Sequence, residues 1–544
     1  MQPISVVAER LGVPSEHLHP HGSFAAKLDT KLLRGPRGRE REPRLVLVSA
    51  ITPTPAGEGK TTTTIGLGDA LAGLGESVCL ALREPSLGPC FGIKGGGTGG
   101  GKAQLVPMDR INLHFTGDFH AITAAHNLLS AVLDNHLHFG NELGIESRRV
   151  VWPRVIDMND RALREIVMGL GGKTHGVPRQ AGFDITAASE LMAILCLAED
   201  EDDLRARIDR TVVAFTRDRR AVTAGELEVT GAMLALLRDA LMPNLVQTME
   251  GTPAVVHGGP FANIAHGCNS VLATRTALHF ADYVITEAGF GFDLGAEKFF
   301  DIKCRSARLD PAAVVLVASA RALKLHGGRK VDELDSPDPA AVERGLENLE
   351  KHIENIEHFG KPPVVALNRF GADTDEEVAV VADFCAARGT AFAVASHFAD
   401  GGAGATELAR KVVEAVAEPS PPYQPLYELT DAVPDKIRKV ATKMYGARDV
   451  LFTKSAERDL AEIARLGFGG LPVCIAKTQS SLSDDPTLGG RPRDFEVTVR
   501  GIQINAGSGF LVVLTGDILR MPGLPRRPQA LAIDLQDGEI TGLR

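Results

Sequence analysis

The chain has 544 residues, of which 44% are hydrophobic and 24% are charged, an ordinary composition for a globular protein of about three domains. The 69 acidic residues outnumber the 59 basic residues and give a formal net charge of -10, so the chain lacks the positive charge that holds nucleic acids or anionic membranes. The seven cysteines are scattered without a CxxC pair, which argues against a disulfide framework and a cysteine-ligated zinc site. We expect a cytoplasmic protein without a nucleic-acid partner.

Neither secretion nor membrane insertion is expected. The N-terminal sequence lacks the basic flank and the apolar core of a secretion signal. The apolar stretches, such as residues 312–320, are far shorter than the ~20 residues that cross a bilayer.

Short apolar runs rich in β-branched residues recur along the chain, each bounded by turn residues. Continuous apolar runs of this kind are typical of strands in a parallel sheet that is covered on both faces. The segments between the runs are long enough for crossover helices. The runs are residues 45–51, 77–82, 253–257, 282–286, 313–319, 363–368 and 391–397. The sequence therefore predicts an α/β fold, a doubly wound and mostly parallel seven-stranded sheet.

One segment breaks this rhythm. Residues 151–247 combine helical patterns at 187–198 and 203–210 with short extended pieces at 211–215 and 226–230. We interpret this segment as an α+β insertion.

A proline-rich linker at residues 418–425 marks a domain boundary, because its four prolines fit neither a helix interior nor a central strand. The remaining residues, 419–544, are predicted as a small α+β domain. Its helical patterns lie at 435–445 and 455–466, and its strands at 473–476, 495–505 and 510–515. The main α/β domain is then discontinuous and comprises residues 1–150 and 248–418.

The first predicted strand leads into a glycine-rich loop, Thr52-Pro-Thr-Pro-Ala-Gly-Glu-Gly-Lys-Thr61, and then into a helical segment, residues 62–74. In such a P-loop, backbone amides and a helix N-terminus surround phosphates, a lysine reaches the terminal phosphate and the next hydroxyl binds Mg²⁺. Lys60 and Thr61 occupy these two positions, although Thr54 stands where the general pattern has glycine. The predicted ATP-binding residues are Thr54, Pro55, Ala56, Gly57, Glu58, Gly59, Lys60 and Thr61.

ATP is favoured over GTP as the nucleotide. Guanine-specific proteins carry Asn-Lys-x-Asp after a late strand, whereas Asn368-Arg-Phe-Gly-Ala-Asp373 has neither that spacing nor the lysine.

Ligands of open parallel sheets bind beyond the carboxyl ends of the strands, so the residues that follow each run form a candidate site. They include an arginine beside the P-loop, which suits bidentate anion recognition, and three phenylalanines, which suit a flat aromatic ligand. The residues are Arg83, Glu84, Gly258-Gly259-Pro260, Glu287, Gly289-Phe-Gly291, Asn368-Arg369-Phe370 and His397-Phe398.

Five histidines crowd residues 114–138, but their spacing does not favour a metal site. His120 and His126 are six residues apart, whereas two ligands on one helix need i, i+4 spacing. Structural roles are favoured. Asp118 has two open interpretations: it caps a helix at 119–133, or it accepts a proton during catalysis.

Long motifs in a fixed order resemble those of the formate–tetrahydrofolate ligase family, also called formyltetrahydrofolate synthetases. The likeness runs from about residue 24 to the C-terminus. The motifs are Thr54-Pro-Ala-Gly-Glu-Gly-Lys-Thr61, Arg83-Glu-Pro-Ser-Leu-Gly-Pro89, Phe91-Gly-Ile-Lys-Gly-Gly-Gly97, Ile111-Asn-Leu-His-Phe-Thr-Gly-Asp118, Thr286-Glu-Ala-Gly-Phe-Gly291, Leu514-Thr-Gly-Asp-Ile518 and Met521-Pro-Gly-Leu-Pro525.

The resemblance implies ATP-dependent joining of formate to tetrahydrofolate in one-carbon metabolism. Formate would be phosphorylated to formyl phosphate, and N10 of the folate would attack the formyl carbon. Formate is a poor electrophile because its carboxylate is resonance-stabilised, and phosphorylation supplies a good leaving group. The resemblance also implies a homotetramer.

The resemblance assigns roles to particular residues. Lys60 and Thr61 would hold ATP and Mg²⁺, Arg83 would bind formyl phosphate, and Glu84 would serve an activating monovalent cation, K⁺ or NH₄⁺. The folate pocket would be lined by Phe290, Phe370 and Phe398.

Three departures from the family pattern concern the folate pocket. Phe398 replaces the usual tryptophan, Gly371 a common proline and Phe292 a small residue. We expect these changes to affect folate affinity and not the type of reaction.

Two other functions remain as alternatives. One is another carboxylate-activating P-loop ligase that resembles dethiobiotin synthetase, and the other is a nucleotide-switched ATPase that binds a partner protein.

Overall fold

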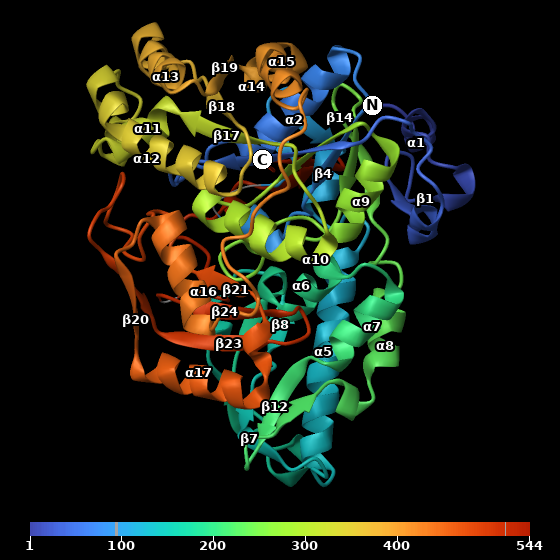
Figure 1. Cartoon of the computed structure of the whole chain (residues 1–544). Helices are drawn as coiled ribbons and strands as arrows, with labels where there is room; N and C mark the ends of the chain where they lie inside the picture. The colour runs from blue at the N-terminus through green and yellow to red at the C-terminus, as the bar shows by residue number, and fades with distance from the viewer. Residues whose placement is uncertain (93–95, 517, 544) are drawn as a thin grey trace.

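The computed structural model describes residues 1–92, 96–516 and 518–543. It has an α/β architecture with one large, mostly parallel sheet and helices around it (Figure 1). Each of the seven predicted strands is present, and each is parallel to its neighbours in the order β15, β4, β16, β3, β17, β18, β19. Their bounds are β3 Arg44–Ala50, β4 Val78–Leu82, β15 Pro253–Val256, β16 Tyr283–Glu287, β17 Ala313–Ser319, β18 Pro363–Asn368 and β19 Ala391–Ala395.

The sheet extends beyond β15 through strands that the sequence analysis did not predict. β14 (Asn244–Thr248) runs antiparallel to β15 and also pairs with β2 (Ala26–Leu28) and β6 (Ala103–Val106). β1 (Leu18–Pro20) and β5 (Gly99–Gly100) complete this edge. The antiparallel strands thus attach the N-terminal segment to the parallel sheet.

Helices cover both faces of the parallel strands, because alternate side chains of β3 point into two different cores. Leu45 and Leu47 belong to a core shared with α9 (Val271–Phe280), α11 (Ala320–His326), α12 (Pro339–His358) and α13 (Asp375–Arg388). Val46 and Val48 belong to a core shared with α2 (Lys60–Gly73) and α15 (Thr406–Ala415). This alternation follows from the two-residue period of a strand.

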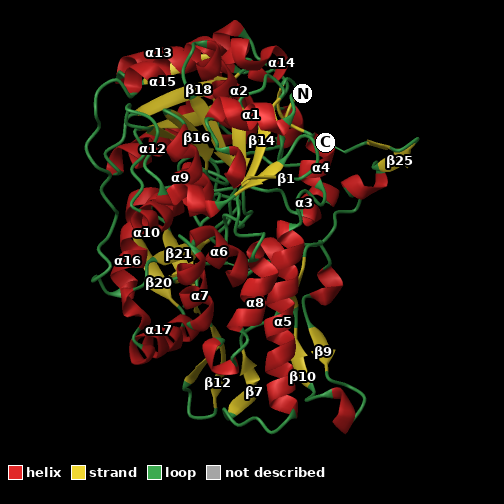
Figure 2. Cartoon of the chain, turned by 90° about the vertical axis from the view of Figure 1, so that its right-hand side faces the viewer, coloured by secondary structure: helices red, strands yellow, loops and turns green. Residues whose placement is uncertain are grey.

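The insertion forms the lower part of the molecule beside the long helix α5 (Asp118–His138) (Figure 2). The two predicted helices are confirmed as α6 (Glu190–Leu197) and α7 (Glu201–Asp209), and the first extended piece as β12 (Val212–Thr216). The prediction of a second extended piece at residues 226–230 was wrong. This stretch holds a 3-10 turn and the start of α8 (Thr230–Leu237), with Glu228 at a φ of 56°.

The C-terminal segment contains both predicted helices, as α16 (Val433–Val440) and α17 (Lys454–Leu466). Residues 441–445 continue α16 as a π-helical turn. The predicted strand at 495–505 is two strands, β22 (Glu496–Val499) and β23 (Gly501–Asn505), while β21 (Val473–Ala476) and β24 (Phe510–Leu514) lie as expected.

The other elements are shorter. They are α1 (Ile4–Leu11), α3 (Leu87–Phe91), α4 (Met108–Asn112), α10 (Arg305–Ala307), α14 (His397–Asp400), β7 (Ile145–Val150), β8 (Arg154–Ile156), β9 (Ile166–Met168), β10 (Arg179–Ala181), β11 (Phe183–Ile185), β13 (Ala221–Thr223), β20 (Asp449–Phe452), β25 (Asp534–Gln536) and β26 (Glu539–Thr541). Among the described residues, none of the helices combines the length and the apolar character that a membrane crossing needs.

Candidate active site

The predicted P-loop lies between the end of β3 and the start of α2. Gly57 and Gly59 adopt left-handed φ angles of 82° and 73°, and Gly59 is the N-cap of α2. A Cβ atom at Gly59 would approach the Asn368 side chain to 3.0 Å, so glycine suits this position for two reasons. The first amide N–H groups of α2 have no partner within the helix and are available for an anion.

Glu58 holds the loop together from inside. Its buried carboxylate accepts hydrogen bonds from the Thr54 amide at 2.8 Å and from the Ser319 hydroxyl at the end of β17. Burial raises the pKa of Glu58. Asn368, at the end of β18, donates to the Glu58 carbonyl at 2.7 Å, so two neighbouring strands fix the loop.

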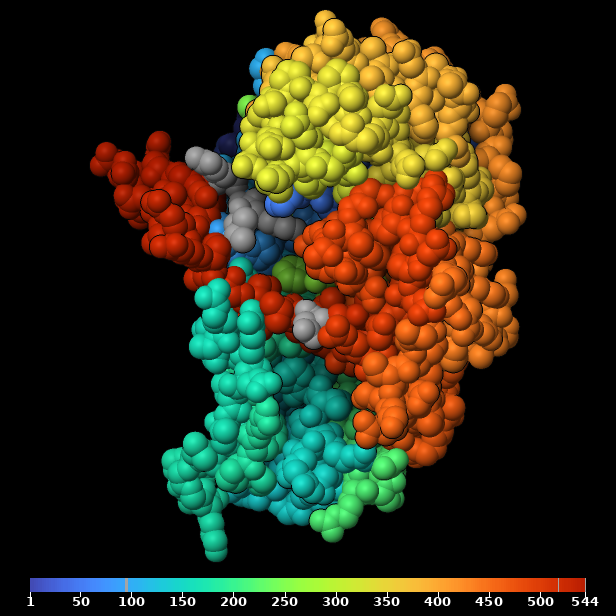
Figure 3. Space-filling view, turned by 90° about the vertical axis from the view of Figure 1, so that its left-hand side faces the viewer, coloured from blue at the N-terminus to red at the C-terminus, as the bar shows by residue number. Residues whose placement is uncertain are grey.

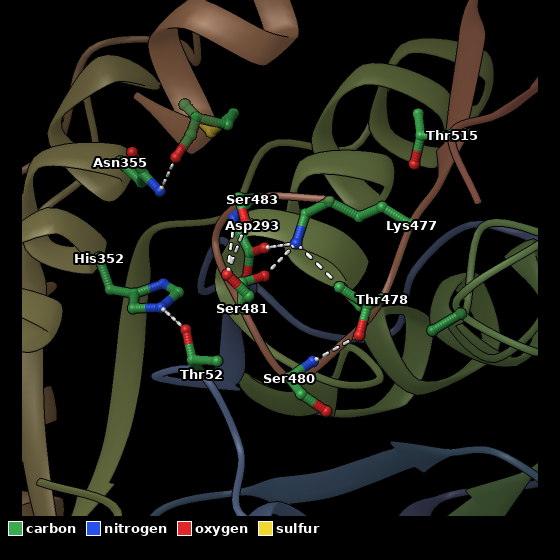
Figure 4. A network of polar contacts seen from close by, with 12 residues as sticks. Thr52, Asp293, His352, Asn355, Lys477, Thr478, Ser480, Ser481, Ser483 and Thr515 are labelled. Atoms are coloured by element: carbon green, nitrogen blue, oxygen red, sulfur yellow. Dashed lines mark hydrogen bonds and ion pairs between the residues drawn. The ribbon is translucent and has the colours of Figure 1, made fainter. Parts of the chain in front are cut away.

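Thr52 anchors the first residue of the loop to two helices. The Thr52 hydroxyl lies 3.1 Å from His352 Nε2 (Figure 4). Asn348 makes two hydrogen bonds to Thr52: its Nδ2 donates to the hydroxyl, and its Oδ1 accepts from the backbone amide at 3.3 Å. His326 Nε2 donates to the Thr52 carbonyl at 2.8 Å, and its Nδ1 accepts from the Gly490 amide at 3.2 Å. The C-terminal segment is therefore linked to the P-loop through His326 and through Asn348, which also donates to the Gly490 carbonyl at 2.7 Å.

A buried ion pair makes a second link between the C-terminal segment and the strand ends. Lys477, directly after β21, lies 2.8 Å from Asp293, which follows the glycine turn 289–291 (Figure 4). Both side chains are buried.

Lys60 and Thr61 begin α2 and face an acidic residue at the end of β16. Thr61 donates its hydroxyl hydrogen to Glu287 Oε2 at 2.7 Å. Burial lowers the pKa of Lys60, and the negative charge of Glu287 opposes that effect. The sequence analysis placed Glu287 at a strand end but gave it no role, and its position directly after a buried strand was the available signal.

Arg83 lies on the other side of Glu287. Its Nη2 is 3.5 Å from Glu287 Oε1, and its buried Nε has no hydrogen-bond partner within the described chain. A Cβ atom at Gly289 would come within 3.0 Å of the guanidinium. The glycine thus leaves room for Arg83, whose free N–H suits an anion.

Glu84 and Asp118 form a buried acidic pair. Glu84 Oε2 has no hydrogen-bond partner within the described chain. The pKa of Glu84 is raised mainly by burial and secondly by the negative charge of Asp118. Asp118 pairs with Lys27 at 2.7 Å and accepts from Asn244 at 2.7 Å. The N-cap interpretation of Asp118 was wrong, because Gly117 is the N-cap of α5 and Asp118 is the first helical residue.

Two of the three predicted folate-pocket phenylalanines are exposed at the ends of neighbouring strands. Phe370 follows β18 with 38% of its surface exposed, and Phe398 follows β19 with 60% exposed. Phe398 packs close to Gly100, and its carbonyl accepts from the Lys102 amide at 2.9 Å.

Phe290 and Phe292 flank Gly291 but lie in different environments. Phe290 follows β16 with a φ of 59° and is partly exposed. Phe292 is fully buried, with its ring centroid 6.2 Å from that of Phe300 and 6.0 Å from that of Phe359. Phe292 therefore belongs to the hydrophobic core.

His126 has a structural role, as predicted for the histidines. It stacks on Trp152 with ring centroids 4.0 Å apart and hydrogen-bonds to the Pro153 carbonyl, and burial lowers its pKa to about 3. His114 and His120 hydrogen-bond to each other at 2.8 Å.

The surface is hollowed on the face that Figure 3 presents. The blue N-terminal part of the chain lies in this hollow, between the yellow segment above and the orange-red C-terminal segment beside it. Two of the predicted motifs lie partly outside the described residues, at 93–95 and 517.

Comparison with known proteins agrees with the motifs. The family model for formate–tetrahydrofolate ligase matches residues 1–544. The chain is 56% identical to a formate–tetrahydrofolate ligase of Methylobacterium nodulans over 100% of its own length and 98% of the relative's. It is 55% identical to the enzyme of that name from Methylorubrum extorquens and 56% to that from Maricaulis maris, each over 100% of this chain and 98% of the relative. This chain belongs to the formate–tetrahydrofolate ligase family.

Membership of the formate–tetrahydrofolate ligase family disfavours both alternative functions. A ligase resembling dethiobiotin synthetase and a nucleotide-switched ATPase would each leave the full-length match unexplained. Lys60 at the start of α2 and the strand-end residues Arg83 and Glu287 form the centre of the candidate active site.

Proposed function

We propose that this protein joins formate to tetrahydrofolate at the expense of ATP and yields 10-formyltetrahydrofolate, ADP and phosphate. The observation that supports it best is the contact of Thr61 and Arg83 with one carboxylate, that of Glu287, beside the P-loop. A nucleotide site and an anion site then share a boundary, which is what transfer of a phosphoryl group to formate requires.

ATP is assigned to the loop of residues 54–61 and the N-terminus of α2. Lys60 stabilises the charge that develops on the transferred phosphoryl group. Glu58 contributes from within the loop, because its carboxylate fixes the Thr54 amide and the end of β17.

Mg²⁺ is assigned to Thr61, with Glu287 beside it. The hydroxyl and the carboxylate are both oxygen donors, as this hard cation prefers, and Mg²⁺ usually completes its shell with phosphates and waters. When bound, it would neutralise charge on the ATP phosphates.

Arg83 is assigned to formyl phosphate. Its side chain keeps a free N–H beside the P-loop, and a guanidinium binds phosphate oxygens in a bidentate manner. Arg83→Gln should lower turnover, because it removes about 2–4 kcal/mol of transition-state stabilisation. Direct titration with ATP in the absence of formate should show that the variant keeps its affinity for ATP. If ATP affinity falls as much as turnover, Arg83 belongs to the nucleotide site instead.

Glu84 is assigned to a monovalent cation, K⁺ or NH₄⁺. Its buried carboxylate oxygen has no partner among the described residues, and a bound cation would offset the burial and the Asp118 charge that raise the pKa of Glu84. We propose Asp118, which Lys27 pairs with, as the acceptor of the proton released by N10 of the folate.

Tetrahydrofolate is assigned to Phe290, Phe370 and Phe398. The exposed rings of Phe370 and Phe398, at the ends of the adjacent strands β18 and β19, offer faces on which a pterin stacks.

We propose a doubly wound P-loop domain (residues 1–150 and 248–418), an α+β insertion (151–247) and a C-terminal α+β domain (419–544), with β14 at the boundary near residue 248. We also propose a cytoplasmic homotetramer, for which light scattering is the measurement.

The test of the activity is omission of each substrate in turn. Purified protein is incubated with Mg-ATP, formate and tetrahydrofolate, and ADP and 10-formyltetrahydrofolate are measured. We expect both products only when all three substrates are present. ADP release that is indifferent to formate and folate would refute the proposal.

A further inference from the structure

A cavity of about 870 Å³ lies between the insertion and the C-terminal segment. The insertion contributes residues of β8, β10 and β12, the preceding strand β7 contributes Arg149 and Val150, and the C-terminal segment contributes α17 and β23. α17 lies beside β12 in Figure 1, and Arg465 of α17 donates to the Arg219 carbonyl after β12. None of the residues assigned above to ATP, formyl phosphate or folate lines this cavity.

The lining is rich in arginine. Seven arginines face four carboxylic acids, a formal excess of three positive charges in a chain whose net charge is -10. The lining contains no lysine. The arginines are Arg149, Arg154, Arg179, Arg219, Arg458, Arg465 and Arg520, and the acids are Asp184, Glu190, Asp459 and Glu462.

Four of these arginines are used within the protein. Arg520 pairs with Asp184 at 2.7 Å and Arg465 with Glu462 at 2.8 Å. Arg154 and Arg179 both pair with Asp134, outside the cavity.

The other three arginines have no ion-pair partner among the described residues. Arg149 lies over the Phe215 ring at 5.9 Å, and its buried Nη1 has no hydrogen-bond partner. Arg219 follows β12 with an exposed side chain, and Arg458 makes only a hydrogen bond to the Lys454 carbonyl at 3.2 Å. Arg149 and Arg219 both act on Glu462, whose pKa is lowered first by the hydrogen bond and the charge of Arg465 and then by the charges of Arg219 and Arg149.

We propose that this cavity is a binding site for a small polyanion that carries two or more carboxylate or phosphate groups. Unpaired guanidinium groups around one open cavity favour such a ligand, because each offers several N–H donors in a fixed plane. The volume falls within the ~300–1,000 Å³ usual for small-molecule sites. The inference does not depend on the ligase activity, because it concerns other residues.

The protein carries its own reporter for this site. Trp152 is the only tryptophan in the chain and lines the cavity. It is 4% exposed and donates its indole N–H to the His126 carbonyl at 3.2 Å. Binding in the cavity should therefore change the intrinsic tryptophan fluorescence.

The experiment is a fluorescence titration of the full-length protein at low ionic strength. The probes are a tri-glutamate peptide and inorganic tripolyphosphate, with triglycine, which has no net charge, as the control. We expect saturable binding of at least one anion and none of triglycine. Binding of only one anion identifies carboxylate or phosphate as the preferred group, whereas no saturable signal with either would overturn the proposal.

Substitutions distinguish the cavity from the P-loop. Arg149→Gln and Arg219→Gln should each weaken anion binding about tenfold, since each removes a charge-assisted contact. Arg217→Gln is the matched control, because Arg217 lies two residues from Arg219, is 93% exposed and does not line the cavity. If the Arg149 variant fails to fold, Arg458→Gln on α17 provides the same test. Equal affinity in the control and the cavity variants would place the anion elsewhere and contradict the proposal.

Discussion

Lys60 starts α2 directly after the glycine N-cap and faces Glu287. We predict that Lys60→Ala lowers formate-dependent ATP consumption by about 10²–10³-fold, because the charge on the transferred phosphoryl group loses its counter-charge. Turnover is measured with saturating substrates, and circular dichroism checks the fold. Lys31→Ala, at a side chain with 68% exposure, is the control that should keep full activity. Retention of a third of the activity in the Lys60 variant would refute its assignment.

Phe398 tests the folate pocket. We predict that Phe398→Ala raises the KM for tetrahydrofolate alone, and that Phe398→Trp lowers it about three- to ten-fold, because a larger ring stacks over a greater area and each 1.4 kcal/mol is tenfold. The ring is 60% exposed, so a larger ring does not have to displace the core. Steady-state kinetics with each substrate varied is the measurement. If alanine at Phe370 and alanine at Phe398 both leave the KM for tetrahydrofolate unchanged, the stacking assignment is wrong.

The residue types were easier to predict than their partners. The P-loop pattern located Lys60 and Thr61 because its chemistry depends on neighbours in sequence. The contact between Thr61 and Glu287 joins residues 226 positions apart, and that between Lys27 and Asp118 joins residues 91 apart. No local pattern contains such pairs, so the contact of Glu287 with Thr61 was missed, and of the two interpretations of Asp118 the helix cap was wrong.

At the scale of elements, the P-loop is held by α11 and α12 through Thr52. We predict that His326→Ala raises the KM for ATP about tenfold, because it leaves the Thr52 carbonyl and the Gly490 amide unpaired, a cost of about 1–3 kcal/mol. The KM values for formate and tetrahydrofolate should stay constant. His326→Gln should raise the KM for ATP less than His326→Ala does. An equal rise in all three constants would indicate general destabilisation and not loop positioning.

The parallel strands were predictable because burial on both faces selects continuous apolar runs, as in β17. The antiparallel strands were not, because β1 and β2 have three residues each and lack such a run. Residues 226–230 were predicted to be extended, and they include two β-branched residues, Val229 and Thr230. The positive φ at Glu228 and the hydrogen bond from Thr230 to Asp209 start a helix there instead.

At the scale of the whole molecule, buried histidines make stability depend on pH. Burial lowers the pKa of His352 from 6.5 to about 3. The unfolded chain then binds this proton at a higher pH than the folded chain, so stability falls by about 1.4 kcal/mol per pH unit as the pH drops from 6.5 toward 3. His352→Gln should remove this contribution.

Urea denaturation of the wild-type protein and of the His352→Gln variant at pH 7, 6 and 5 measures how the stability of each depends on pH. Glu190, whose pKa burial raises to about 7, acts in the opposite direction, because its neutral form is favoured in the fold and stability is lost as the pH rises. That contribution is common to both proteins and cancels in their difference. Parallel stability curves would contradict the prediction for His352.

The position of β3 in the sheet has a consequence for biosynthesis. β3 is made early, but its neighbours β16 and β17 begin about 230 residues or more after it ends. At about 5–20 residues per second, a ribosome needs roughly 10–50 s to make that stretch. During this time an apolar strand, buried at six of its seven positions in the finished protein, has no partner and resembles the segments that aggregate. The growing chain therefore carries an apolar strand without its neighbouring strands, a state prone to aggregation, until the second half of the sheet emerges.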